Sequence, residues 1–127
     1  MSRHGDILYI HHIADACHRI MQYTAGLDAA AFASSGLVQD AVIRQLEIIG
    51  EASNKVSRAF QAEHPDISWT EMKGLRNVLI HDYPSVVPSI VWDIAKNDLP
   101  VLLENLNCIF SQRQDAAEEG PDPADDR

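Results

Sequence analysis

The sequence predicts an all-α protein: an up-down bundle of about five helices with short connections. Apolar residues recur at spacings of three and four along most of the chain, the period of a helix with one buried face. Residues that cap or break helices separate these stretches, and no stretch alternates in the manner of a strand. With 127 residues, of which 46% are hydrophobic, we expect one domain with a single core.

The first predicted helix runs from about Asp6 to Thr24. Gly26 is placed to end it as a C-cap, and Asp28 can cap a short turn of helix through Phe32. One apolar stripe on this first helix is expected to be buried: Ile10, Ile13, Cys17, Ile20 and Thr24.

A long helix is predicted next, over 37–61, after the break at Ser34-Ser35-Gly36. His64-Pro65 ends it, because a residue that precedes proline avoids the helical conformation. Its apolar face consists of Val38, Val42, Leu46, Ile49, Val56 and Phe60.

Three further helices are predicted in the second half of the chain. The capping box at 68–71 opens one that ends near 81–83, since Pro84 follows. Ser85 can cap the next helix, which has Pro88 in its first turn. Asn97-Asp98 is expected to interrupt that helix, and Pro100 lies in the first turn of the last helix. The core residues expected on them are Met72, Leu75, Val78 and Leu79, then Ile90, Val91 and Ile94, and finally Leu102, Leu106, Ile109 and Phe110.

Charge and composition divide the chain into a helical domain over 1–113 and an acidic tail over 114–127, which we expect to be disordered. The tail contributes −5 to a net charge of −9, so the body carries −4 and cannot offer RNA a broad basic surface. We expect a cytoplasmic protein, since neither a membrane span nor a signal peptide is recognisable. Cys17 and Cys108 are expected to be reduced packing residues.

The segment from Arg76 to Tyr83, RNVLIHDY, is the strongest candidate for chemistry. A histidine transfers protons near neutral pH, and a guanidinium stabilises charge on phosphate oxygens. Such a pair suits RNA cleavage without metal, because the substrate supplies its own 2′-hydroxyl nucleophile. The spacing alone favours a solvated surface arginine and a histidine that caps a helix C-terminus. Arg76 and His81 also lie about 140° apart on an ideal helix. Their side chains can therefore meet only if the long arginine stem reaches round the helix or if the helix unwinds before Pro84.

The same octet resembles the Arg-x4-His-x-Tyr signature of the HEPN superfamily, in its HepT-like branch. AVIRQLEIIGEASNKVS, over 41–57, is similar to the long-helix signature of that branch, with Ile-Gly-Glu-Ala at 49–52. The resemblance extends over about 6–110, with further matches at Trp69, Val91-Trp92 and Asp98-Leu99-Pro100.

This resemblance implies a helical homodimer in which the arginine and histidine of both protomers meet in a cleft at the interface. It implies that Arg76 and His81 are catalytic and that Asn77 orients the arginine or the phosphate. Asp82 fills a variable position. Tyr83 matches the tyrosine that, in this branch, is adenylylated by an MNT-type nucleotidyltransferase antitoxin, and a bulky anion there would block the RNA cleft.

Together these inferences predict the toxin of a HEPN/MNT toxin–antitoxin system: an RNA endonuclease without metal or other cofactor, acting on tRNA or mRNA. The acidic charge favours an alternative, a non-catalytic HEPN subunit that serves a nucleotidyltransferase in a complex.

Other features have simpler explanations. His11, Asp15 and His18 could ligate a metal from one helix face, but a solvated polar face is favoured. Trp69 and Trp92 could stack on bases, but core packing is favoured. Close helix packing is favoured for Gly50, whereas Glu51 stays open between such packing and a contact with a cleft or a dimer partner.

Overall fold

The computed structural model describes residues 3–82 and 87–118, with side chains for 5–75 and 87–113. Within these ranges every regular element is helical, which confirms the all-α prediction. The elements are α1 (Arg3–Thr24), α2 (Ala29–Ala33), α3 (Gly36–Lys55), α4 (Arg58–Glu63), α5 (Trp69–Asp82), α6 (Pro88–Asp93), the π-helical segment η1 (Ile94–Asp98) and α7 (Leu99–Glu118).

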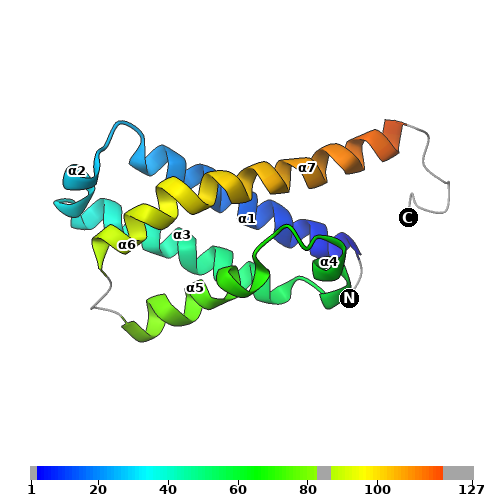
Figure 1. Ribbon diagram of the computed structural model, residues 1–127, viewed down its shortest axis with the longest axis horizontal. Coiled ribbons are helices and arrows are strands. Elements are labelled where there is room, and N and C mark those ends of the chain that lie inside the picture. The colour runs from blue at the N-terminus through cyan, green and yellow to red at the C-terminus, as the bar shows by residue number, and fades with distance from the viewer. Residues whose placement is uncertain (1–2, 83–86, 119–127) are drawn as a thin grey trace.

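Four long helices that alternate in direction form the bundle (Figure 1). The α1 helix packs along α3, α3 packs along α5, and α7 returns along α1. The short α2 helix contacts α6 at one end of the bundle, and α4 lies at the other end, near the N-terminus. This is the up-down arrangement that the short connections predict.

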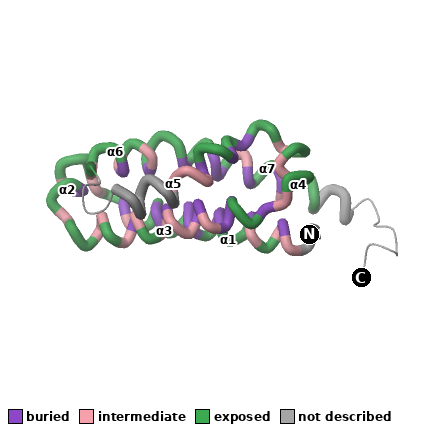
Figure 2. The backbone as a smooth tube through the Cα atoms, turned by 90° about the horizontal axis from the view of Figure 1, so that it is seen from below, coloured by how far each residue is buried: buried purple, intermediate pink, exposed green. Residues whose placement is uncertain are grey.

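Most of the predicted apolar stripes contribute to the core, and the tube drawing shows buried stretches on the sides of the long helices that face one another (Figure 2). All five members of the α1 stripe are buried, Thr24 included, because its hydroxyl donates to the Ile20 carbonyl at 2.9 Å. The α3 and α7 helices contribute Val42, Leu46, Ile49, Leu102, Leu106 and Ile109.

The predicted caps in the first part of the chain are confirmed. Gly26 has a φ of +77°, the left-handed conformation that ends a helix and suits glycine. Asp28 accepts a hydrogen bond from the Ala31 N–H at 2.8 Å, and Ser35 accepts one from the Val38 N–H at 3.2 Å.

The prediction of one helix over 37–61 is wrong, because the chain breaks between α3 and α4. Val56 is extended, with ψ of 136°, and its side chain is buried. Ser57 then caps α4 by accepting from the Phe60 N–H at 3.2 Å. Its own N–H and hydroxyl donate to the buried carboxylate of Asp6 on α1. Turning the chain here buries Val56 and gives Asp6 its partners.

The predicted interruption at Asn97-Asp98 is also wrong, because α6 continues through η1 into α7 without a break. The Leu99 N–H donates to the Ile94 carbonyl, the five-residue step of a π-turn. Pro100 has no N–H, and its ring would clash with the carbonyl four residues earlier in a regular α-turn. The wider π-turn accommodates the proline, which does lie in the first turn of α7 as expected.

The start of α6 differs from the prediction as well. Pro88 is its first residue and Val87 is its N-cap, so the helix does not begin at Ser85, which lies outside the described residues. Val91 is buried as expected, whereas Ile90 is 57% exposed.

The α7 helix extends to Glu118, so the first part of the segment expected to be disordered is helical. The remainder, 119–127, lies outside the described residues. None of the described helices is long and apolar enough to cross a membrane.

Candidate functional site

The N-terminal half of α5 is anchored against the loop and helix that precede it. The helix begins at Trp69, where the capping box predicts it. The Trp69 indole is buried, donates through Nε1 to the His64 carbonyl at 2.9 Å and meets the Phe60 ring edge-on. Lys73 Nζ donates to Gln61 Oε1 at 2.9 Å. These contacts set the position of the C-terminal half of α5 and its rotation about the helix axis. They also confirm core packing for Trp69.

The predicted catalytic positions lie on the C-terminal half of α5, beyond these anchors. Arg76, Asn77 and His81 belong to a backbone that stays α-helical through Asp82, so the helix does not unwind at these positions. The described side chains end before them, and Tyr83 lies outside the described residues.

Helical register separates the two catalytic positions. At 100° per residue, the His81 position lies about 180° around α5 from the buried Met72. Arg76 lies only about 40° from Met72. Within one chain the two positions therefore occupy different faces of the helix.

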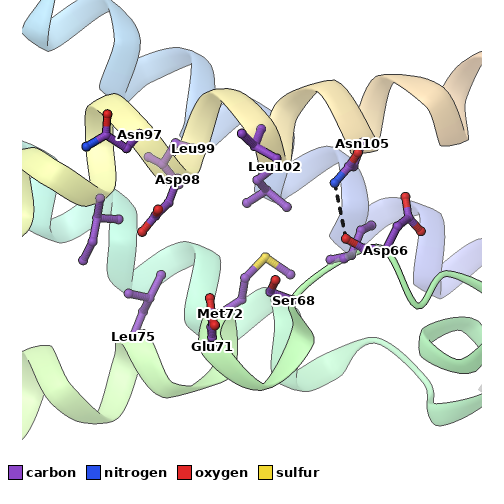
Figure 3. A pocket seen from close by; sticks show the side chains of 13 residues that line it. Asp66, Ser68, Glu71, Met72, Leu75, Asn97, Asp98, Leu99, Leu102 and Asn105 are labelled. Atoms are coloured by element: carbon purple, nitrogen blue, oxygen red, sulfur yellow. Dashed lines mark hydrogen bonds between the residues drawn. The ribbon is translucent and has the colours of Figure 1, made fainter.

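A groove of about 220 Å³ separates α5 from η1 and α7 (Figure 3). Its floor contains the buried side chains of Ile67, Met72, Leu99 and Leu102. Leu75, immediately before Arg76, also lines it. Asn105 on α7 donates to the Asp66 carbonyl at 3.3 Å and so connects its two walls at one end.

The rim of this groove is acidic. Asp66, Glu71 and Asp98 are exposed and line it, and none of the lining residues that the structure describes is basic. Asp98 points from η1 toward α5, above Leu75 (Figure 3). Sequence reasoning missed this feature, because the walls come from segments about thirty residues apart that only the fold brings together. The local signal was Asp66 and Glu71 among the apolar residues of 66–75, together with Asp98 among those of 94–102.

The histidine-rich face of α1 forms no metal centre. No group of three potential ligands close enough to hold a metal occurs among the described residues. His11, Asp15 and His18 are exposed, and the His11 ring stacks on Phe110 with centroids 4.4 Å apart. The favoured interpretation, a polar face, agrees with this exposure.

The remaining features are structural in character. Cys17 and Cys108 are both free thiols, and Cys17 is buried as expected, whereas Cys108 is exposed, so the prediction that it packs in the core is wrong. Gly50 is buried on α3, which packs against both α1 and α5. Trp92 is half-buried against Phe32, with centroids 5.3 Å apart.

A family model described as "Ribonuclease HepT-like" matches residues 13–109, which include α3, α5 and the motif. The chain belongs to the HepT-like ribonuclease family, within the HEPN superfamily. This confirms the family that the sequence predicts, and with it the enzyme class. The matched range falls inside the helical domain expected over 1–113.

Relatives of this HepT-like chain carry ribonuclease names. It is 33% identical over 109 residues to "Putative RNase MJ1380" of Methanocaldococcus jannaschii, covering 86% of this chain and 100% of that protein. It is 40% identical over 94 residues to "Probable ribonuclease HepT" of Thermococcus cleftensis, covering 74% and 86%. No solved structure matches the chain significantly.

Proposed function

We propose that this HepT-like chain is a toxin that cleaves RNA endonucleolytically and without metal, with Arg76 and His81 as its catalytic residues. The observation that carries the proposal is the Arg-x4-His motif on the C-terminal half of α5, in a chain that belongs to a ribonuclease family. The half of α5 that bears the motif follows a firmly anchored half. Such anchoring is what a catalytic pair needs for fixed geometry.

The residues fit transesterification within the RNA strand. The 2′-oxygen bonds to phosphorus and the bond from phosphorus to the 5′-oxygen breaks, leaving a 2′,3′-cyclic phosphate and a 5′-hydroxyl end. One proton leaves the 2′-oxygen and one reaches the 5′-oxygen, and the imidazole of His81 can perform either transfer. Arg76 would bind the phosphate and stabilise the added charge in the transition state. Asn77, next to it in the chain, would orient the arginine or the phosphate.

The register of α5 supports a site shared between two copies of the chain. The His81 position lies about 180° around α5 from the buried Met72, so a second protomer could approach it from that side. Just beyond the motif, Val87 and Ile90 are 48% and 57% exposed, an apolar surface suited to a dimer contact. A two-fold cleft with two copies of Arg76 would also concentrate positive charge in an otherwise acidic protein.

Control by an MNT-type nucleotidyltransferase antitoxin forms part of this proposal. The enzyme would transfer AMP from ATP to the Tyr83 hydroxyl and release pyrophosphate. The added phosphodiester carries a negative charge beside His81, where it would repel and obstruct the RNA backbone.

The test is cleavage of total RNA, or of tRNA, by the purified protein in excess EDTA. We expect His81→Ala to slow cleavage by about 10²- to 10⁴-fold and Arg76→Ala by about 10²- to 10³-fold. His18→Ala and Arg19→Ala are matched controls on the exposed face of α1 and should leave the rate unchanged. Activity that survives in His81→Ala would refute the assignment. So would cleavage of an oligonucleotide that lacks 2′-hydroxyls.

A non-catalytic HEPN subunit in a nucleotidyltransferase complex is the second candidate, favoured by the net charge of −9. It predicts a stable complex with the nucleotidyltransferase and no RNA cleavage by the chain alone. The same assay therefore separates the two functions.

A further inference from the structure

We propose that the groove between α5 and α7 is a docking site for a segment of another protein, one that presents apolar side chains flanked by lysine or arginine. The groove lies on a different side of α5 from the His81 position, whereas the Arg76 position directly follows the lining residue Leu75. The proposal does not depend on RNA cleavage. It rests on the burial, charge and position of the described lining residues.

The floor provides the apolar part of the site. Ile67, Met72 and Leu102 are 3%, 5% and 9% exposed, so only small parts of them reach the groove. Val101, on the edge, is 57% exposed although it is fully apolar. Covering this strip with apolar side chains would remove it from water, which drives docking.

The rim provides the charge. The carboxylates of Asp66, Glu71 and Asp98 surround the apolar strip, and within the described part of the chain none of them forms an ion pair or a side-chain hydrogen bond. A segment with basic residues beside its apolar ones would place cations against all three. Charge complementarity of this kind accelerates association and excludes wrong partners.

The π-turn contributes directly to the rim. The five-residue step at η1 precedes Leu99, and Asp98, at the end of η1, points across the groove toward α5 (Figure 3). At the far end, the hydrogen bond from Asn105 to the Asp66 carbonyl holds α7 to the loop before α5. Both walls are therefore held in place before any partner binds, which lowers the entropic cost of docking.

The same charges disfavour other occupants. Among the described lining residues, RNA phosphates would meet three carboxylates and no lysine or arginine. The chain's own segment 119–127 is acidic and would be repelled. A second copy related by a two-fold axis through this face would bring two acidic rims together, and their negative charges would repel each other. A basic segment of a different protein fits best.

The probe is a fluorescent synthetic helical peptide with leucine along one face and lysine elsewhere, added to the full-length protein at about 0.15 M salt. Anisotropy measures its binding. We expect the double variant Glu71→Gln/Asp98→Asn to bind about tenfold more weakly. The matched control, Asp15→Asn/Glu104→Gln, removes the same charge from exposed positions outside the groove and should bind as the parent does. Circular dichroism verifies that both variants are folded.

A second pair of variants tests the apolar strip, and hydrogen exchange locates the peptide. Val101→Ser should weaken binding, whereas Leu37→Ser, at an even more exposed leucine, should not. The peptide should slow amide exchange in 66–75 and 94–105. Equal weakening in the groove and control variants would overturn the proposal by showing attraction to net charge alone. An RNA oligonucleotide that protects the same segments, or a dimer that dissociates in Val101→Ser, would also overturn it by assigning the groove to RNA or to a second copy.

Discussion

The carboxylate of Asp6, at the start of α1, holds Ser57, at the start of α4. Its two oxygens accept from the Ser57 N–H at 2.8 Å and from the Ser57 hydroxyl at 2.7 Å. The Asp6 side chain is only 2% exposed. The serine hydroxyl meanwhile accepts from the Phe60 N–H, so one aspartate supports the cap of a distant helix.

We expect Asp6→Ala to lower the free energy of unfolding by about 1–3 kcal/mol, because it leaves two part-buried donors of Ser57 without their acceptor. Urea denaturation followed by circular dichroism measures the change. Asp15→Ala removes an exposed carboxylate from the same helix and should have little effect. If both variants lost the same free energy of unfolding, the contact with Ser57 would contribute nothing to stability.

We expect that mixing the inactive variants Arg76→Ala and His81→Ala restores part of the RNase activity. The positions are about 140° apart on one helix, so a shared site would join an arginine and a histidine from different chains. Mixed dimers would then retain one intact pair. Subunit exchange must first be demonstrated with differently tagged chains. If mixed dimers form and stay inactive, the pair acts within one chain.

We expect Tyr83→Phe to remain a ribonuclease that the nucleotidyltransferase no longer inhibits. Removing the hydroxyl removes the acceptor of AMP but leaves Arg76 and His81 in place. Mass spectrometry after incubation with the nucleotidyltransferase and ATP should show one adenylyl group on the parent and none on the variant. Tyr23→Phe, on α1, is the control and should be modified as the parent is. Modification of Tyr83→Phe would place the acceptor elsewhere.

The two cysteines should differ strongly in reactivity. Burial raises the pKa of the Cys17 thiol to about 12, whereas Cys108 is exposed. At about pH 8, near the ordinary thiol pKa, iodoacetamide should label Cys108 quickly and leave Cys17 unmodified until the protein unfolds. The folded thiol titrates above the unfolded one, so its contribution to stability is complete below about pH 8.5 and is lost as the pH rises toward 12. Rapid labelling of Cys17 in a native Cys108→Ser variant would contradict its burial.

Features that depend on neighbours in the sequence were predicted well. The caps at Asp28 and Ser35, the left-handed Gly26 and the start of α5 at Trp69 follow from local chemistry. Most of the buried stripes also match, because a helix with one apolar face can lie against a bundle in only one rotation. The candidate catalytic positions on α5 rest on the same kind of local evidence, their spacing and family resemblance, and stay a prediction.

Features that depend on distant residues were missed. The break after Lys55 depends on Asp6, which is 51 positions from Ser57. Ile90 follows the apolar pattern yet faces solvent, because no other helix of the described bundle covers that side of α6. Nothing in the local sequence distinguishes these cases from an ordinary helix interior or an ordinary buried position.

The sequence by itself determined the helical class, the buried stripes, the family and the positions on α5 that carry the candidate chemistry. Each of these follows from periodicity or from residues close together in the chain. The tertiary structure alone decided where the long helix divides, how the π-turn joins α6 to α7, and that 66–75 and 94–105 form the two walls of an acidic groove. Those outcomes depend on contacts between residues tens of positions apart, which local patterns do not encode.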